Sequence, residues 1–378
     1  MAKKTNTKIN GANYFRVTAT VGKKVDGSNI RKQFYGESKR DAETKRDEYM
    51  ANIKQGLAVN YDKALFGIAF KSWLEDVLRP SVSLSTYKRH EIEYRLRIAD
   101  CGLAGMKLTE MRAANIQAFY NTLLETCTPT TVRTMHKLIN QFFLYCVKAD
   151  ILVKNPMLAV ESPKVKNKIL TNRALTDIDV EKILNAAKQN RKHFVYAFAI
   201  FTGLRAGEIL ALTHEDVDLN TNTITVNKSV KFLNYDGGYK PLLTSPKTQQ
   251  GNRTIPIAGA IKKLLRSHIC YEMEKHLRLC IPFSPQSILF SSDVCTYRET
   301  PNLLRMFKKF CNRLGIDEYT LHSLRHTFCT ILVKQGVPLK TASILMGHSD
   351  VTITARVYTH VDEDEKRKGI ERLSAYFA

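Results

Sequence analysis

Hydrophobic and polar positions follow three different patterns along the chain, and the first of them covers residues 1–62, which are mostly polar. Two partly alternating runs separated by an Asp-Gly turn signal predict strands at residues 13–21 and 30–35. Ser38 then precedes Asp41 at the spacing of a capping box, in front of a charged helix. This pattern predicts a hairpin or a three-stranded sheet packed on one helix.

Residues 63–165 carry apolar positions at helical spacing, in three successive stripes. The stripes consist of Phe66, Phe70, Trp73, Leu74, Val77; Ile116, Phe119, Tyr120, Leu123, Leu124; and Val132, Met135, Ile139, Phe142, Phe143, Cys146. We expect them to form a helical core. Lys88, Arg89, Arg133 and Lys137 fall on the polar faces, which are either simply solvated or in contact with DNA.

Prolines and lysines then interrupt the helical pattern and indicate a linker. Beyond it, a helix is expected behind Thr176, and strands are expected near residues 223–230 and 253–257. The three patterns predict three domains, at residues 1–62, 63–165 and 166–378.

Composition adds a strong positive charge, because 58 Lys and Arg face 36 Asp and Glu and leave a net charge of +22. All three segments are basic, which favours a polyanionic partner contacted along the whole chain, although a merely soluble basic protein remains open. The eight cysteines form no CxxC pair, so we expect reduced thiols in a cytosolic protein. The apolar run at residues 194–204 is shorter than the ~20 residues that cross a membrane, and no secretory signal follows the basic start.

Familiar cofactor sites find no support in the sequence. Neither GxxxxGK[ST] nor GxGxxG occurs, so nucleotide hydrolysis and hydride transfer are not indicated. His322 and His326 have metal-ligand spacing, but the glutamate of HExxH is missing and Arg325 between them would repel a cation. We therefore expect no metal and no cofactor.

Cations, histidines and one tyrosine instead recur in five short motifs of the third segment. These motifs are Thr202–Glu208, Pro246–Thr248 followed by Arg253–Pro256, Leu321–His326, Leu345–His348 and Ala355–His360. Their order and spacing resemble those of the tyrosine recombinases, also called the phage integrase family. The two upstream segments are similar, less specifically, to the arm-binding and core-binding domains of integrases from conjugative transposons and temperate phages.

The chemistry of strand cleavage asks for these residue types independently of the resemblance. Displacement at a phosphodiester gathers negative charge on the non-bridging oxygens, and two guanidiniums such as Arg205 and Arg325 can clamp them. A phenol has a pKa of ~10 and becomes nucleophilic only beside cations and a base. Tyr358 is the expected nucleophile, because its competitors Tyr319 and Tyr376 lie in no matching motif.

The resemblance implies the remaining roles. Lys247 would be the general acid, His322 would assist proton transfer and bind the phosphate, and His348 would hydrogen-bond it. Glu208 would orient the site without reacting, since a carboxylate repels phosphate. Three nearby lysines remain alternatives to the general acid, namely Lys228, Lys231 and Lys240.

The resemblance also implies a multidomain, mainly α fold, with a small α+β N-terminal domain, a helical core-binding domain and a mixed α/β, mostly helical catalytic domain. The expected activity is strand cleavage and rejoining through a 3′-phosphotyrosyl intermediate, independent of metal and ATP, to integrate and excise a conjugative transposon or prophage. The expected partners are core-type and arm-type sites on double-stranded DNA, three further copies of the chain on two duplexes, and an accessory excision protein. The expected location is the bacterial cytoplasm, on the nucleoid and not on a membrane.

Two surfaces carry expectations of their own. In the N-terminal segment, Arg16, Lys23, Lys24, Arg31 and Lys32 would contact arm-site phosphates, with a protein-interaction role as the rival. In the C-terminal tail, an apolar stripe would dock on a neighbouring protomer or on its own domain, and it consists of Ile370, Leu373 and Phe377. The alternatives for the whole chain are a type IB topoisomerase-like relaxase and a non-catalytic DNA-binding regulator.

Overall fold

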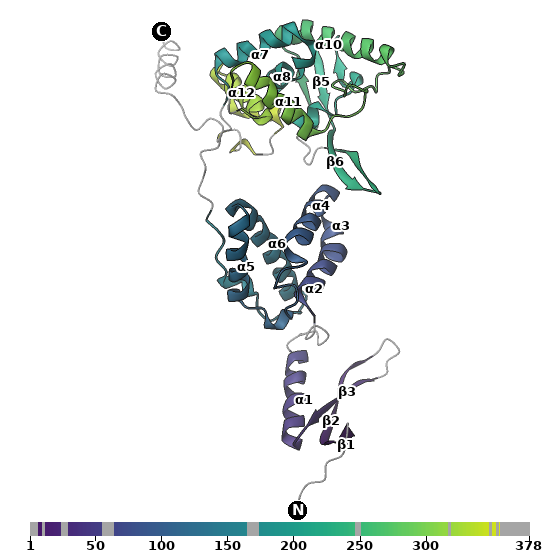
Figure 1. Ribbon diagram of the computed structural model, residues 1–378, viewed down its shortest axis with the longest axis vertical. Helices are drawn as coiled ribbons and strands as arrows, with labels where there is room; N and C mark the ends of the chain where they lie inside the picture. The colour runs from purple at the N-terminus through teal and green to yellow at the C-terminus, as the bar shows by residue number, and fades with distance from the viewer. Residues whose placement is uncertain are drawn as a thin grey trace, which may run out of the picture. The chain divides into compact units, whose positions relative to one another are not determined.

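The structure is a computed structural model that describes residues 7–9, 12–23, 29–54, 64–164, 174–245, 251–316, 319–347, 350–352 and 355. The chain forms two compact units, Met1–Lys166 and Asn167–Ala378, and each is described by itself (Figure 1). The predicted boundaries at residues 62 and 165 adjoin stretches outside the described residues, so the division into three domains stays a prediction. The mainly α fold with small sheets is as predicted.

The first unit begins with an antiparallel sheet in the order β1-β2-β3, followed by one helix. These elements are β1 (Thr7–Ile9), β2 (Ala12–Lys23), β3 (Asn29–Gly36) and α1 (Lys39–Lys54). Phe34 of β3 is buried and packs edge-on against Tyr49 of α1, with 5.0 Å between the ring centroids. The backbone N–H of Asp41 donates to Ser38 Oγ at 3.1 Å, which confirms the predicted cap of the helix.

The rest of the first unit is a bundle of helices with a core of its own. Its elements are α2 (Phe66–Ser72), η2 (Trp73–Leu78), α3 (Arg79–Ser81), α4 (Leu84–Glu93), η3 (Tyr94–Ile98), η4 (Leu108–Glu110), α5 (Ala113–Thr126), α6 (Pro129–Lys148) and η5 (Pro156–Ala159). The first and third predicted stripes line this core, except that Val77 is only partly buried. In the second stripe the prediction was wrong for Leu124, which lies near the end of α5 and is 39% exposed.

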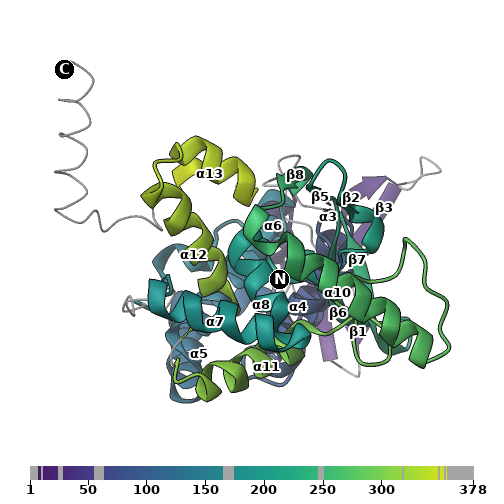
Figure 2. The ribbon, with the colours of Figure 1, turned by 90° about the horizontal axis from the view of Figure 1, so that it is seen from above.

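Within the described residues, the second unit combines helices with two small sheets, and Figure 2 shows them from above. Its helices are α7 (Asp177–Gln189), η6 (Arg191–His193), α8 (Phe194–Thr202), α9 (Ala206–Ile209), η7 (His214–Asp216), α10 (Gly259–Arg278), α11 (Thr300–Arg313), α12 (Leu321–Lys334) and α13 (Leu339–Met346). Its strands are β4 (Val217–Asp218), β5 (Thr223–Val226), β6 (Ser229–Tyr235), β7 (Gly238–Thr244) and β8 (Arg253–Pro256).

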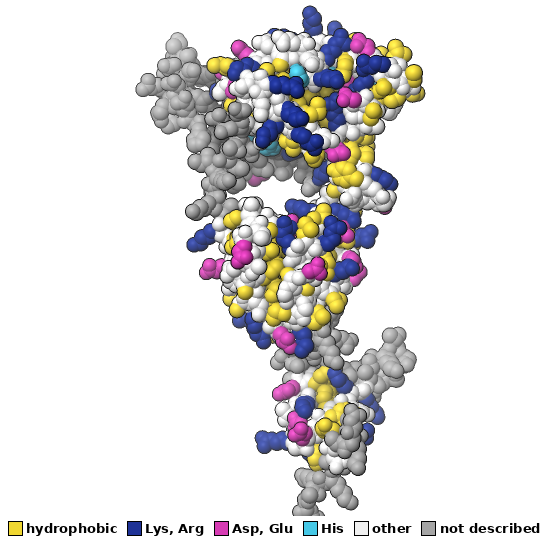
Figure 3. Space-filling view, in the orientation of Figure 1, with side chains coloured by type: hydrophobic (Ala, Val, Ile, Leu, Met, Phe, Trp, Pro, Cys, Tyr) yellow, Lys and Arg dark blue, Asp and Glu magenta, His cyan; other side chains and the backbone are white. Residues whose placement is uncertain are grey.

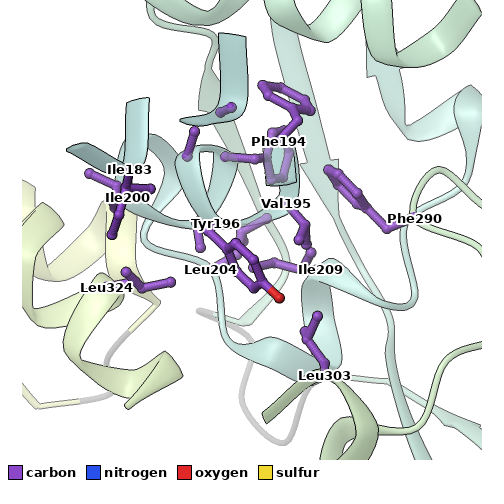
Figure 4. Close-up of a cluster of buried hydrophobic side chains, with 14 of the residues drawn as sticks. Ile183, Phe194, Val195, Tyr196, Ile200, Leu204, Ile209, Phe290, Leu303 and Leu324 are labelled. Carbon is purple, nitrogen blue, oxygen red and sulfur yellow. The ribbon is translucent and has the colours of Figure 1, made fainter. Parts of the chain in front are cut away.

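Helix α8 lies at the centre of this unit, because it is apolar on every side and contacts α7, α10 and α12. Figure 4 shows its residues Phe194, Val195 and Tyr196 among buried side chains from the surrounding elements. The helix ends at Gly203, whose φ of 62° is left-handed. An added Cβ at this glycine would collide with the ring of Phe328 of α12, so the glycine also allows α12 to approach.

The predicted strand at residues 223–230 is in fact two strands in different sheets. β5 pairs with β4 and β8, whereas β6 pairs only with β7 in a separate hairpin. The chain leaves the first sheet at Lys228, whose ammonium lies 2.9 Å from the buried carboxylate of Asp216. This ion pair holds the chain at the break, where Asn227 and Lys228, residue types that are depleted in strands, interrupt the β-forming run. Among the described helices, none is long and apolar enough to span a membrane.

A buried ionic cluster joins α10 to the segment after it. Glu272 accepts hydrogen bonds from Lys275 Nζ at 2.9 Å and from Ser291 Oγ at 2.6 Å, and all three residues are at most 2% exposed. Burial raises the pKa of Glu272, although Lys275 and Ser291 oppose the shift. The carboxylate is thus the partner that makes a buried ammonium tolerable at this place.

Replacing Glu272 with alanine is therefore expected to destabilise the second unit by about 3–5 kcal/mol, because it leaves the Lys275 charge buried and unpaired. The measurement is urea unfolding followed by hydrogen exchange of α10. Trp73, the single tryptophan, reports on the first unit by fluorescence, and its transition should not move. Glu274→Ala is the matched control, since its exposed pair with Arg191 contributes at most about 1 kcal/mol. Equal effects of the two substitutions would contradict the assignment.

Candidate active site

Arg205 stands at the turn between α8 and α9, where it is the N-terminal cap residue of α9. Its backbone N–H and its guanidinium both donate to the carboxylate of Glu208, each at 2.9 Å. The Arg205 side chain remains 45% exposed, whereas that of Glu208 is 5% exposed. The buried carboxylate of Glu208 thus holds the backbone N–H and one guanidinium nitrogen of Arg205, while the rest of the guanidinium stays exposed to solvent.

Arg325 comes from α12 and is almost enclosed, with an exposed fraction of 2%. Its guanidinium donates to the carbonyl oxygens of Gly203 and Met346, both at 2.6 Å, and so joins the ends of α8 and α13. Burial and, next, the charge of Arg205 lower the pKa of Arg325 to about 9. At neutral pH the group remains charged, and an anion placed beside it would relieve the cost of that charge.

Glu208 is shared with a third arginine, Arg253, at the start of β8. Arg253 Nη2 lies 3.0 Å from a carboxylate oxygen of Glu208, and its side chain is 5% exposed. Burial alone would raise the pKa of Glu208, but the hydrogen bond and charge of Arg253, helped by Arg205, hold that pKa below its ordinary value. Glu208 is therefore ionised at neutral pH and partly neutralises a site that is otherwise cationic.

His322 lies in the first turn of α12, with its ring centroid 4.7 Å from that of His326. Partial burial, followed by the charges of Arg325 and Arg205, lowers the pKa of His322 below its ordinary value. Burial and the neighbouring His322 and Arg325 lower the pKa of His326 to about 4. Both rings are neutral at pH 7, so His322 is able to accept a proton.

The structure thus brings Arg205, His322 and Arg325 into one cluster, while three other predicted site residues, Lys247, His348 and Tyr358, lie outside the described residues. Arg205 Nη2 donates to the carbonyl oxygen of Gly347 at 3.3 Å. Gly347 is the residue immediately before His348, so the two arginines bind the backbone directly before His348 in the sequence.

Two competing assignments fit the structure poorly. The ammonium of Lys228 is bound by Asp216 and Thr213, and that of Lys240 by the carbonyl oxygen of Asp236, which disfavours both as a general acid. Tyr319 is 8% exposed and its hydroxyl lies 3.3 Å from Asp179 Oδ2, so it belongs to the core of the unit. Lys231 lies on β6, whereas Tyr376 and the C-terminal stripe at residues 370–377 are outside the described residues.

Arg253 is the site residue that the sequence did not single out. It belongs to the motif Arg253–Pro256 but carried no predicted role. The signal was its place a few residues after Lys247, at the start of a strand that pairs with β5. Its partners Glu208 and Leu345 are 45 and 92 residues away in sequence, so no local pattern reveals them.

The candidate DNA contacts of the first unit fall on different faces of its elements. Arg16 and Arg31 lie on the face of the sheet away from Phe34, because they alternate with the residues that face α1. Lys32 lies on the α1 side, with its ammonium 3.9 Å from the centroid of the Tyr49 ring. Lys24 lies outside the described residues and Lys23 ends β2.

In the helical bundle, Arg89 of α4 and Arg133 and Lys137 of α6 are exposed. Lys88 is half-buried and pairs with Glu91 at 2.8 Å, which leaves it less suited to a phosphate. Basic side chains are numerous on the face of the molecule shown in Figure 3.

Comparison with known proteins agrees with these features. Residues 173–365 match the model of the phage integrase family. A tyrosine recombinase XerC-like protein of Caldanaerobacter subterraneus subsp. tengcongensis is 34% identical, and the match covers 100% of both chains. The ICEBs1 integrase of Bacillus subtilis is 28% identical over 68% of this chain and 69% of its own length. The chain belongs to the phage integrase family and is a tyrosine recombinase.

Solved structures show the same fold. A Tn1549 transposon integrase in complex with transposon right end DNA has a TM-score of 0.68 at 23% identity, covering 82% of this chain and 99% of the other. A lambda integrase tetramer bound to a Holliday junction has a TM-score of 0.57 at 17% identity, covering 93% and 97%.

Proposed function

We propose that this protein is a site-specific DNA recombinase that integrates and excises a mobile element through a 3′-phosphotyrosyl intermediate. The observation that carries the proposal is the cluster of Arg205 from one motif with His322 and Arg325 from another, in which both arginines interact with the buried carboxylate of Glu208. The mobile-element role is supported by the ICEBs1 and Tn1549 integrases, to which the chain is similar. The similarity to recombinases and integrases favours this function over a topoisomerase-like relaxase.

In the cleavage step, the phenol oxygen of Tyr358 attacks the scissile phosphorus and the bond from phosphorus to the 5′ oxygen breaks. His322, neutral at pH 7, takes part in removing the phenol proton. Lys247 gives a proton to the leaving 5′ oxygen, which departs as a hydroxyl. Arg205 and Arg325 neutralise the charge that gathers on the non-bridging oxygens, and His348 hydrogen-bonds the same phosphate.

In the rejoining step, a 5′ hydroxyl from a second strand attacks the phosphotyrosyl phosphorus. The proton of that hydroxyl passes to the Lys247 amine left neutral by cleavage, the bond from phosphorus to the tyrosine oxygen breaks, and Tyr358 regains the proton that His322 helped to remove. Each step exchanges one phosphodiester for another, so the energy of the broken bond is retained and no nucleotide needs to be hydrolysed.

Strand exchange between two duplexes requires four such sites. We propose a tetramer of this chain on two DNA duplexes, which the similarity in fold to a lambda integrase tetramer on a Holliday junction supports. The open face of the N-terminal sheet, with Arg16 and Arg31, is proposed to bind arm-type sites. Arg89, Arg133 and Lys137 are proposed to contact core-type DNA.

The test is trapping of the full chain on a nicked duplex made from the ends of its host element. The nick lets the cleaved strand diffuse away, so a covalent protein–DNA adduct accumulates, and peptide mapping is expected to place the DNA on Tyr358. DNA attached to any other residue, or no adduct on end sequences that the protein binds, would reject the proposal. Relaxation of plasmids that lack the end sequences, without recombination, would instead support the topoisomerase-like alternative.

A further inference from the structure

The C-terminus of α13 is held by three arginines from three different parts of the chain. Its last carbonyl groups have no partner within the helix and carry partial negative charge. Leu345 O accepts from Arg253 Nε at 2.8 Å, Met346 O from Arg325 at 2.6 Å, and Gly347 O from Arg205 at 3.3 Å. Three consecutive carbonyls thus bind three different guanidiniums, directly before His348.

Arg253 binds protein groups through all three nitrogens of its guanidinium. Nε binds Leu345 O, Nη1 binds Gly251 O at 3.2 Å, and Nη2 binds Glu208 at 3.0 Å. The side chain is 5% exposed, and its Nε, Nη1 and Nη2 all bind groups of the protein itself. An effect of Arg253 on the reaction is therefore expected to pass through the groups that it holds.

Two of those groups, Glu208 and the carbonyl of Leu345, connect Arg253 to other residues of the site. Glu208 fixes the exposed guanidinium of Arg205, and Leu345 lies in the last turn of α13, the helix that precedes His348 in the chain. Gly347 has a φ of 66°, and an added Cβ there would lie 2.7 Å from Arg253 Nη1. The helix end, the carboxylate and the guanidinium therefore fit together as one tightly packed unit.

We propose that Arg253 is a positioning residue of the recombinase. Through Glu208 it sets Arg205 against the scissile phosphate, and through Leu345 it sets the segment that carries His348. This inference rests on the proposed function, and it predicts that loss of Arg253 weakens the neutralisation of the phosphate without removing a group that touches it.

The test compares two substrates that differ only in charge at the scissile position. In a methylphosphonate, a methyl group replaces one non-bridging oxygen, so the phosphorus centre is neutral and needs less positive charge from the protein. Single-turnover cleavage on the phosphodiester is expected to fall ~10- to 100-fold in Arg253→Gln, less than the 10²–10³-fold loss from removal of a direct donor. On the methylphosphonate the defect should shrink at least ~10-fold, as it should for Arg205→Ala, which removes the direct contact.

A purely structural role gives a different result. Glu272→Gln perturbs the buried cluster of α10, so any defect it causes should be equal on the two substrates. If the defect of Arg253→Gln is also equal on both, the proposal is wrong. A double variant with Glu208→Gln should be little worse than Glu208→Gln alone if Arg253 acts through Glu208, and additive losses would contradict that route.

Two further variants cover a failure of Arg253→Gln to fold. Arg253→Lys keeps the charge and should retain part of the activity with the same dependence on the substrate. Gly347→Ala leaves every arginine in place and presses on Arg253 from the other side, with the same expected dependence. Wild-type protein that forms no adduct on the phosphodiester would reject the proposed function itself, whereas a reactive wild type with unshifted variants would reject this inference alone.

Discussion

Replacing Tyr358 with phenylalanine is expected to abolish the covalent protein–DNA adduct, with a loss of at least ~10⁴-fold in cleavage. In the proposed mechanism the phenol oxygen forms the new bond to phosphorus, and the described residues of the cluster offer no nucleophile to replace it. Arg205 and Arg325 carry guanidiniums, which are not nucleophiles, and the proposed role of His322 is to take part in moving the phenol proton. The measurement is adduct formation on the nicked duplex, resolved by denaturing electrophoresis.

Binding to the same DNA should be unchanged in this variant, since the substitution removes one hydroxyl and no charge. Tyr319→Phe is the matched control, because its hydroxyl is held by Asp179 inside the core and should not affect the adduct. Persistent adducts in Tyr358→Phe, or their loss in Tyr319→Phe, would show that the nucleophile is assigned to the wrong tyrosine.

The fold could be predicted from the sequence wherever one periodicity governs a whole element. The stripe from Val132 to Cys146 is buried throughout, because α6 is long and presents one continuous apolar face. The prediction failed where the ends of an element are set by contacts between residues distant in the sequence. The strand expected at residues 223–230 divides at Lys228 into strands of two different sheets, and the Lys228 ammonium there pairs with the buried Asp216.

The residues of the candidate site could be predicted where the proposed reaction requires a particular type of side chain. A phosphate clamp requires arginines, and the motifs supplied Arg205 and Arg325, which the structure places together. Arg253 could not be found in this way, because two of its three partners, Leu345 O and Gly251 O, are backbone carbonyls. A carbonyl is present at every residue and leaves no trace in the sequence, so only the folded chain shows which carbonyls meet a guanidinium.

Replacing Arg325 with lysine is expected to reduce cleavage by about 10²–10³-fold although the charge is conserved. A lysine ammonium cannot bind Gly203 O and Met346 O in the planar geometry of the guanidinium and still present a donor to the phosphate. The variant should also lose stability, by about 1–3 kcal/mol for each buried carbonyl left without a donor. Both effects are expected from one side chain, because Arg325 joins α8 to α13 and is proposed to clamp the scissile phosphate.

Single-turnover cleavage and the unfolding transition of the second unit measure the two effects separately. Arg266→Lys is the matched control, since Arg266 lies exposed on α10 and should change neither. If Arg325→Lys destabilises the unit but cleaves at the wild-type rate, Arg325 holds the two helix ends without acting on the phosphate. If it cleaves slowly at full stability, the two carbonyls do not need the guanidinium, and the contacts at 2.6 Å contribute less than their burial suggests. We expect stability and cleavage rate to fall together. The two Arg325 nitrogens that bind Gly203 O and Met346 O hold the ends of α8 and α13 together, and the same two bonds fix the orientation of the guanidinium.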